Sequence, residues 1–538
     1  MPDRTLPDRP SLEQYKKQAK ELARASAAGD PAALARVRKH HPRLRELPPD
    51  QPHPLPLADA QFVLAREHNF ESWPKFAGHL ETLRIIRSLE SLPDPVNTFL
   101  EVASVDRHGW HASGTLEYPD RLLVRYPEVA AAGIYTAAVL ADEPRVRSFL
   151  ARDPALATAK GGPHGWDALT YLCFSRYLRL DKSRSDAFTA TARALLEAGA
   201  SANTGFTEYI DDPPRPVPES AIYGAAGLAQ HPGVTRLLLE YGADPNDEET
   251  PYHVPETRDN TVMQIILESG RFNERSLSWL AARKADWHDE AGLRLALEYG
   301  ADPNYATHWK FTPFQHSIRR DNSLAMIQLF LDHGADPNLR NARSGRNAFQ
   351  MAAWRGRGDI LTLLEQRGFT LQYDQPLDWL VAACAHADLP RAQSLLAQEP
   401  ILLQRLLHKG GSLLARFAGV GNLAGVRTLL ALGIPVDLLW EDGDPYFEEA
   451  KNSTALHVAA WRASHDVVGE LVAAGAAVNA LDARGRTPLQ LAVKACVDSY
   501  WKSDRQPDSV AALLQAGARV DGINLPTGYD AIDALLMK

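Results

Sequence analysis

Apolar residues recur along most of the chain at intervals of three and four positions, which is the spacing of one face of an α-helix. The pattern is clear at Leu12–Ala28, Pro31–His40 and Leu57–Glu67, and it returns in many short segments after about Ala130. Many of the later segments end in glycine, which stops a helix easily because it accepts the left-handed conformation. The chain is therefore predicted to consist mainly of short helices separated by tight turns.

One short phrase marks the ends of these predicted helices. It is an apolar pair, a spacer, Gly-Ala, and then an Asn or Asp that favours a tight turn. Its clearest copies are Leu195–Asn203, Leu237–Asn246, Leu295–Asn304, Leu329–Asn338, Leu471–Asn479 and Leu513–Asp521. Gly300, Gly334 and Gly368 lie 34 residues apart, whereas Gly433, Gly475 and Gly517 lie 42 apart. This self-similarity predicts a stack of equivalent helical units, with insertions where the spacing is longer.

A second phrase precedes several of these units, as Thr312-Pro313-Phe314, Thr454–Ala460 and Thr487–Ala492. Thr suits a helix N-cap, Pro suits the first helical position, and the small Ala residues permit close packing of helices. Together the two phrases resemble those of ankyrin-repeat proteins. The resemblance implies an all-α solenoid of stacked helix-turn-helix pairs with short β-turn fingers. It also implies partner binding through the turn tips and the concave face of the first helices.

The first ninety or so residues lack both phrases. Leu12–Leu22 and Leu57–Leu80 look like the leader found in many bacterial ankyrin-repeat proteins, which implies a bacterial source. We expect a small helical leader or cap at residues 1–90, an array of about ten units at 91–521, some of them degenerate, and a capping helix at 522–538. The repeat register is least regular at residues 250–290 and 370–440.

Charge argues against generic affinity for nucleic acid or for an anionic membrane, because 58 Lys and Arg face 67 Asp and Glu, a formal net charge of −9. The leader alone is locally basic, and Tyr15 is the only aromatic residue among its cations. A solvated amphipathic cap is therefore favoured over nucleic-acid binding. The basic residues are Lys16, Lys17, Lys20, Arg24, Arg36, Arg38, Lys39, Arg43 and Arg45.

No apolar stretch is long enough to span a bilayer, and the amino terminus lacks the order of a secretory signal. Cys173, Cys384 and Cys496 lie too far apart to indicate a disulfide framework or a cysteine zinc site. We therefore expect a cytoplasmic, monomeric protein.

The sequence contains no phosphate-binding loop, nucleophile elbow or zinc-protease helix, so no catalytic residue, cofactor or metal site is expected. His108 and His111 stand at i and i+3, but Gly109 argues against a helix there and no third ligand is evident. An enzyme or metal-dependent regulator with a cryptic site in the divergent regions remains the alternative. His457 is expected to hydrogen-bond within its own helical hairpin.

Candidate partner-binding residues come from three features. Fingers after Asn203, Asn246 and Val436 carry aromatic rings beside carboxylates, which suits a basic peptide unless they are ordinary solvated loops. Insertions at Ser175–Lys182 and Ser499–Arg505 either line a binding face or extend helices whose rings pack on a neighbour. The pairs Arg319-Arg320, Trp354-Arg355 and Trp461-Arg462 stand at equivalent places in three repeats. They either border the concave groove or pack between neighbouring repeats. The candidates are Tyr209, Tyr252, Trp309, Trp440, Tyr446, Tyr500, Trp501, Arg319, Arg320, Trp354, Arg355, Trp461 and Arg462.

The sequence thus predicts a noncatalytic scaffold that binds one or more proteins of unknown identity.

Overall fold

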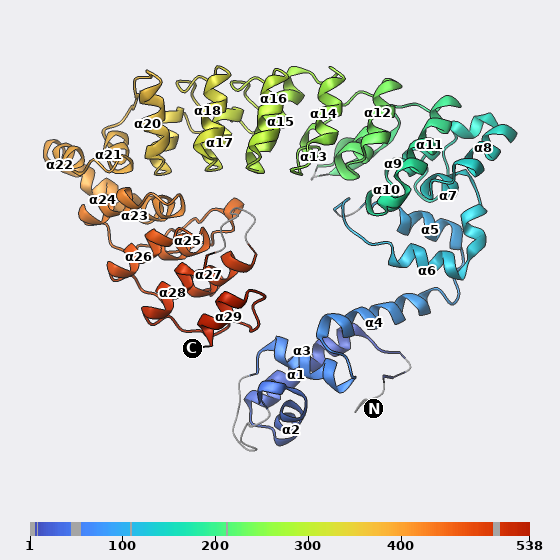
Figure 1. Ribbon diagram of the computed structural model, residues 1–538, viewed down its shortest axis with the longest axis horizontal. Coiled ribbons are helices and arrows are strands. Elements are labelled where there is room, and N and C mark those ends of the chain that lie inside the picture. Colours follow the sequence, from blue (N-terminus) through green and yellow to red (C-terminus); the bar gives the residue numbers. More distant parts are fainter. Residues whose placement is uncertain are drawn as a thin grey trace. The chain divides into compact units, whose positions relative to one another are not determined.

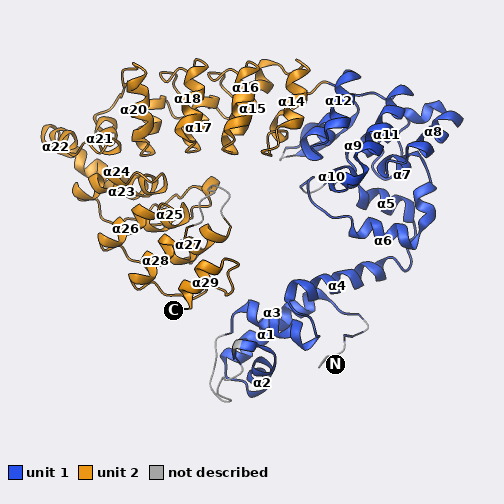
Figure 2. Ribbon diagram, viewed as in Figure 1, with its two compact units in different colours: residues 1–243 blue, residues 244–538 orange. Residues whose placement is uncertain are grey.

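The computed structural model of the protein is built mainly from short α-helices (Figure 1). It describes residues 6–7, 9–44, 55–107, 110–210, 213–498 and 506–537. The chain divides into two compact units, Met1–Ala243 and Asp244–Lys538 (Figure 2). The prediction of an all-α solenoid of stacked helix pairs is confirmed, with one β-hairpin as the exception within the described residues.

Unit 1 begins with the three helices predicted for the leader, α1 (Leu12–Ala27), α2 (Pro31–His40) and α3 (Leu57–Glu67). They are followed by α4 (Trp73–Ser88), which was not predicted as a separate helix. Their apolar stripes meet in two clusters made of leader residues. Tyr15 is buried in one of them, edge-on to Phe76 with ring centroids 5.0 Å apart. This tyrosine therefore offers no exposed ring on which a nucleic-acid base can stack.

The rest of unit 1 stacks helices in two rows. Helix α7 packs between α5 and α9, while α11 packs against α8 and α12. The elements are α5 (Pro95–Ala103), α6 (Glu117–Arg125), η2 (Pro127–Ala131), α7 (Ile134–Val139), α8 (Glu143–Arg152), η3 (Pro154–Ala157), α9 (Ala168–Cys173), α10 (Arg176–Leu180), η4 (Lys182–Arg184), α11 (Ser185–Glu197), the π-helix η5 (Tyr223–Leu228) and α12 (Pro232–Glu240).

The finger after Asn203 is a two-stranded antiparallel hairpin rather than a short turn. Strand β1 (Gly205–Ile210) pairs with β2 (Arg215–Ser220), with Phe206 opposite Glu219 and Glu208 opposite Val217. Side chains alternate between the faces of a strand, so these four residues share one face. The helical repeat pattern gave no signal for this hairpin because its period-2 segment is only a few residues long.

Unit 2 is also built from two rows of helices. Helices α13, α15, α17, α19, α21, α23, α25 and α27 pack one on the next as the first helices of their pairs, and their partners form the second row. The elements are α13 (Thr250–His253), α14 (Thr261–Glu268), α15 (Glu274–Asp286), α16 (Glu290–Glu298), α17 (Pro313–Arg319), α18 (Leu324–Asp332), α19 (Ala348–Trp354), α20 (Gly358–Gln366), α21 (Pro376–Ala385), α22 (Leu389–Gln398), α23 (Ile401–Gly419), α24 (Leu423–Ala431), η6 (Pro445–Phe447), α25 (Ala455–Trp461), α26 (His465–Ala473), α27 (Pro488–Val497), α28 (Asp508–Gln515) and α29 (Asp530–Leu536).

The two sequence phrases fold as their chemistry predicts. Thr312 and Thr454 are N-caps of capping boxes, and Gly334 ends α18 in the left-handed region with φ 84°. The Asn of the first phrase does more than favour a turn. Asn304 donates to the carbonyl of Gly334 at 2.9 Å and accepts from the Asp336 amide at 2.8 Å, which ties one turn to the next.

Three further predictions are tested by the fold. Cys173, Cys384 and Cys496 are buried, and no disulfide joins them. His457 lies inside its hairpin, 2.8 Å from the Thr454 hydroxyl, and also reaches the carbonyl of Ala480 at 3.0 Å. In the described part of the chain, no helix is both long enough and apolar enough to cross a membrane.

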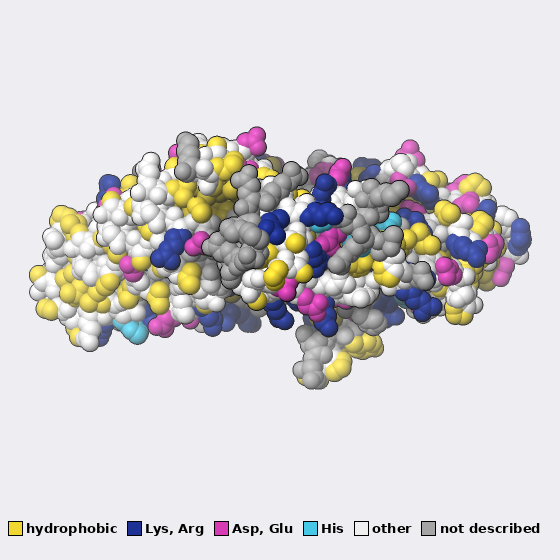
Figure 3. All heavy atoms as spheres, turned by 90° about the horizontal axis from the view of Figure 1, so that it is seen from below, with side chains coloured by type: hydrophobic (Ala, Val, Ile, Leu, Met, Phe, Trp, Pro, Cys, Tyr) yellow, Lys and Arg dark blue, Asp and Glu magenta, His cyan; other side chains and the backbone are white. Residues whose placement is uncertain are grey.

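On the face seen in Figure 3, Lys and Arg lie among Asp and Glu, and neither sign dominates.

Candidate functional site

Three arginines of unit 2 occupy the same structural position. Arg320, Arg355 and Arg462 are the C-cap residues of α17, α19 and α25. The equivalence predicted from the sequence is therefore confirmed. A cation at this position interacts favourably with the carbonyl end of its helix, and all three side chains bind carboxylates of unit 2.

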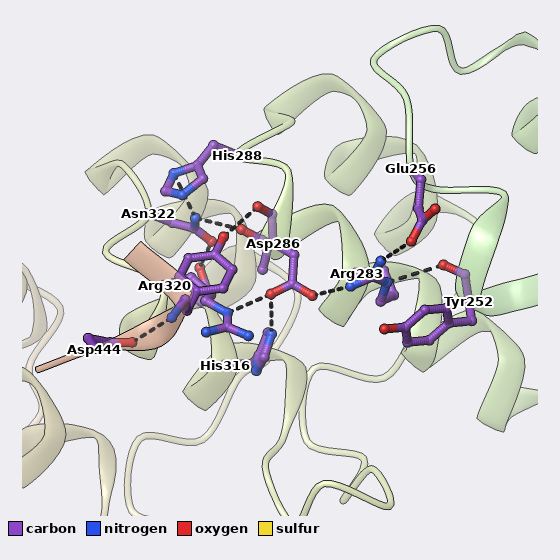
Figure 4. Close-up of polar contacts among 12 residues, drawn as sticks. Tyr252, Glu256, Arg283, Asp286, His288, His316, Arg320, Asn322 and Asp444 are labelled. Carbon is purple, nitrogen blue, oxygen red and sulfur yellow. Dashed lines mark hydrogen bonds and ion pairs between the residues drawn. The ribbon is translucent and has the colours of Figure 1, made fainter. Parts of the chain in front are cut away.

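The first carboxylate is that of Asp286, the last residue of α15 (Figure 4). It accepts hydrogen bonds from His316 at 2.8 Å, Arg320 at 2.5 Å and Arg283 at 2.6 Å. Burial by itself raises the pKa of Asp286, but the hydrogen bond and charge of His316 and the two guanidinium groups outweigh it and hold that pKa well below its usual range. Asp286 is thus a buried anion that fixes three donors.

The second carboxylate is that of Asp321, one residue beyond the C-cap of α17. It accepts from Arg355 through both oxygens, at 2.5 and 2.6 Å, and lies 3.4 Å from Arg462. Burial disfavours its ionised form, yet Arg355 and then Arg462 lower the pKa of Asp321. One carboxylate therefore pairs with two C-cap arginines, and its contact with Arg355 has the two-pronged geometry that suits guanidinium groups.

Residues 440–449, which we call the inner loop, pack against these arginines. The Tyr446 hydroxyl donates to the Asp286 carbonyl at 2.6 Å, and the Arg320 guanidinium lies 3.4 Å from the centre of the Tyr446 ring. Phe447 lies between Arg355 and Arg462, whose guanidinium carbons are 5.5 and 4.0 Å from its ring centre. This part of the predicted acidic finger is held against the first helices.

The inner loop also brings two carboxylates to the same arginines. Asp444 lies 3.9 Å from Arg355, and Glu449 lies 3.4 Å from Arg462. Burial raises the pKa of Glu449 to about 7, although Arg462 partly offsets this. The carboxyl groups of Asp444 and Glu449 therefore face arginines of the first helices rather than solvent.

A cavity of about 560 Å³ opens beside this network. Trp287, the C-cap residue of α15, is 39% exposed there, and Arg258 is also exposed. Arg283 fixes the opposite wall, because its guanidinium stacks 4.0 Å from the Tyr252 ring centre. The lining residues are Tyr252, Arg258, Arg283, Asp286, Trp287, His288, Arg320 and Tyr446.

The chemistry of this cavity suits recognition of an anionic group beside an aromatic or apolar one. Two of its three guanidinium groups already bind Asp286, and that of Arg283 also pairs with Glu256, so Arg258 is the exposed cation of the lining. Burial, with the nearby charge of Arg462, lowers the pKa of His288 to about 4, so this side chain is neutral at physiological pH.

The two candidate tryptophans beside the C-cap arginines are buried. Trp354 donates to Asp378 at 2.6 Å, and Trp461 donates to the Phe447 carbonyl at 2.5 Å. Both side chains therefore pack between neighbouring repeats, which is the alternative to lining an open groove. Trp440 is buried as well.

The other candidates lie at different places. Trp309 is half-buried and stacks on His316 with ring centroids 5.3 Å apart, while Arg319 lies over the Phe311 ring at 4.9 Å. Tyr209 is exposed on the hairpin of unit 1, and Tyr500 and Trp501 lie outside the described residues. In the other insertion, Tyr177 is buried and donates to Asp120 at 2.7 Å, so its ring packs on a neighbour, although the insertion forms the separate helix α10 rather than an extension of α9.

Sequence reasoning missed the carboxylates and the cavity residue that matters most. Asp286 and Arg320 are 34 residues apart, as are Asp321 and Arg355. An acid placed one repeat before an arginine was therefore a usable signal. Trp287 was not identified from the sequence.

Two segments of unit 2 match family models for ankyrin repeats. Residues 315–365 match the model described as ankyrin repeats (many copies), and residues 414–524 match ankyrin repeats (3 copies). Among solved structures, the chain is similar to the human ASB11 ankyrin repeat domain at 20% identity, over 40% of this chain and 89% of that chain, with a TM-score of 0.30.

Proposed function

The chain is an ankyrin-repeat protein, and on that premise we propose that it is a noncatalytic scaffold that binds one or more protein partners. The partner docks on the C-terminal ends of the first helices of unit 2 and on the neighbouring turn fingers. The observation that carries this proposal is the cavity of about 560 Å³ at those helix ends. Concave pockets with aromatic walls and a few fixed polar groups are where binding energy concentrates.

The partner chemistry follows from the charges of the cavity. Arg258 and Trp287 are the accessible groups, and Asp286 is already bound by three donors. An acidic residue next to an aromatic or aliphatic one complements this surface. The hypothesis that the finger after Val436 captures a basic peptide is weaker, because Asp444 and Glu449 face internal arginines.

The test is a pull-down from native lysate, quantified by mass spectrometry, with a double variant Arg258→Ala and Trp287→Ala. The matched control is Trp379→Ala with Arg391→Ala, which removes an exposed tryptophan and an exposed arginine from α21 and α22. Circular dichroism establishes that both variants are folded. A protein retained by wild type and control but lost by the cavity variant supports the proposal; equal retention by all three rejects the cavity as the docking site.

We also propose that the protein acts as a monomer in a bacterial cytoplasm and without nucleic acid. The supporting facts are the net charge of −9, the three cysteines that form no disulfide and the buried Tyr15 ring. Light scattering during gel filtration tests the monomer, and a mobility shift at low salt tests nucleic-acid binding. A dimer mass or a salt-sensitive shift contradicts the respective statement.

A further inference from the structure

Unit 1 contains a buried group of three potential metal ligands that lies outside the partner-binding surface. His111 comes from the segment between α5 and α6, Glu208 from β1 and Glu219 from β2. Their ligand atoms all lie within 4.8 Å of one another. The side chains are 9%, 14% and 4% exposed, respectively.

The hairpin register is what brings the two glutamates together. Glu208 lies opposite Val217, so Glu219 is its diagonal neighbour on the same face of the hairpin. Phe206 shares that face and stacks on Trp166 with ring centroids 4.5 Å apart, and it meets Phe174 edge-on at 4.8 Å. This aromatic packing anchors the hairpin, so the carboxylates are held in place before any ligand arrives.

The histidine is oriented toward the carboxylates. Its Nδ1 lies 3.0 Å from the Tyr223 hydroxyl, which comes from η5, and its Nε2 lies 3.2 Å from Glu208 Oε1. That Glu208 oxygen is buried and accepts no hydrogen bond from the residues that the structure describes. Nε2 and Oε1 thus face each other closely without the alignment of a hydrogen bond. A cation that accepts a lone pair from each atom fits this arrangement.

We propose that His111, Glu208 and Glu219 bind one divalent first-row transition-metal ion. One imidazole nitrogen and two carboxylate oxygens form a donor set used for such ions, and three protein ligands leave coordination positions open. Tyr223 is the outer partner that fixes the imidazole orientation, as metal-binding histidines require. The site is independent of the scaffold function proposed for unit 2.

One of the three ligands borders a cavity. Glu219 lines a cavity of about 430 Å³, together with Phe206, Arg107, Lys160, His164 and Trp166. This cavity offers space on the Glu219 side of the site for water or an anionic ligand of the metal. The competing explanation is that His111 is an imidazolium ion paired with the two carboxylates, without a metal.

The experiment uses the full-length chain, stripped with a chelator and dialysed. Titration with Co²⁺, followed by its visible absorption, and calorimetric titration with Zn²⁺ measure stoichiometry and affinity. The variants are Glu208→Gln and Glu219→Gln, which keep size and remove the anionic ligand, and Tyr223→Phe. Glu128→Gln, an exposed glutamate of η2, is the matched control.

The proposal predicts one ion per chain for wild type and the control, and a raised melting temperature when metal is present. Each glutamine variant binds at least about tenfold more weakly, and Tyr223→Phe weakens binding about 10- to 100-fold. Circular dichroism of each variant separates ligand loss from unfolding. Absence of saturable binding to folded wild type, or equal affinity in wild type and both glutamine variants, overturns the metal site in favour of the imidazolium ion pair.

Discussion

Replacing Asp321 by asparagine removes the charge that serves two buried arginines while keeping the shape of the side chain. Asp321 is 4% exposed, and Arg355 and Arg462 are 13% and 8% exposed. The residue has a left-handed backbone with φ 53°, which asparagine tolerates well. The substitution therefore tests the electrostatic contact rather than the turn.

The expected cost follows from what remains after the change. Removing one partner of a buried ion pair costs about 3–5 kcal/mol, because the other charge stays buried. Here Arg355 keeps Asp444 at 3.9 Å and Arg462 keeps Glu449 at 3.4 Å. These longer contacts satisfy the arginines only in part, so we expect the lower end, about 3 kcal/mol.

The assay is urea unfolding followed by circular dichroism, with midpoint and slope compared between variants. The control is Asp374→Asn, which breaks the ion pair with Arg340, where the side chains are 44% and 51% exposed. Exposed pairs contribute at most about 1 kcal/mol. A loss below about 1 kcal/mol for Asp321→Asn, equal to the control, refutes the account of a buried charge network.

Two more predictions concern pH and packing. Burial lowers the pKa of His253, but hydrogen bonds from its ring to Glu249 and Glu256 outweigh this and raise it to about 9. Because the folded pKa exceeds the ordinary 6.5, the stabilisation from protonated His253 is complete below pH 6.5 and is lost as pH rises through 9. In thermal melts across that range, the free energy of unfolding of wild type should fall by about 3 kcal/mol more than that of His253→Gln. Equal losses in the two proteins would contradict this prediction. Gly358→Ala places a methyl against a backbone carbonyl of α21 and should cost about 1–3 kcal/mol, whereas Gly469→Ala, on an open helix face, should gain about 0.5–1 kcal/mol in the same urea assay. A larger loss of stability for Gly469→Ala than for Gly358→Ala would contradict the close approach of Gly358 in α20 to the backbone of α21.

The repeat architecture could be predicted from sequence because it rests on local chemistry. The cap made by Thr312 and the turn at Gly334 involve only a few neighbouring residues. The contact made by Asn304 reaches only the next repeat. The helix bounds of the leader were predicted for the same reason. Residue limits for the leader, the array and the capping helix remain predictions.

The candidate site was predicted only in part, because its geometry depends on contacts between distant segments. The equivalence of Arg320, Arg355 and Arg462 was visible, but the inner loop that covers them lies far along the chain, as the Tyr446 bond to Asp286 across 160 residues shows. His111 was considered without Glu208 and Glu219, because both lie in a distant segment of the chain. Glu208 lies 97 positions later by residue number, on a hairpin that helical periodicity does not indicate.

We propose that a protein partner contacts the cavity beside Trp287. An aromatic photo-crosslinking amino acid, which keeps a ring in place of the indole, is introduced at position 287 and, in a second variant, at position 379, another exposed tryptophan of unit 2. Irradiation in cells should yield a defined crosslinked protein from position 287 and not from position 379. No crosslink from 287, or the same products from both positions, would contradict it.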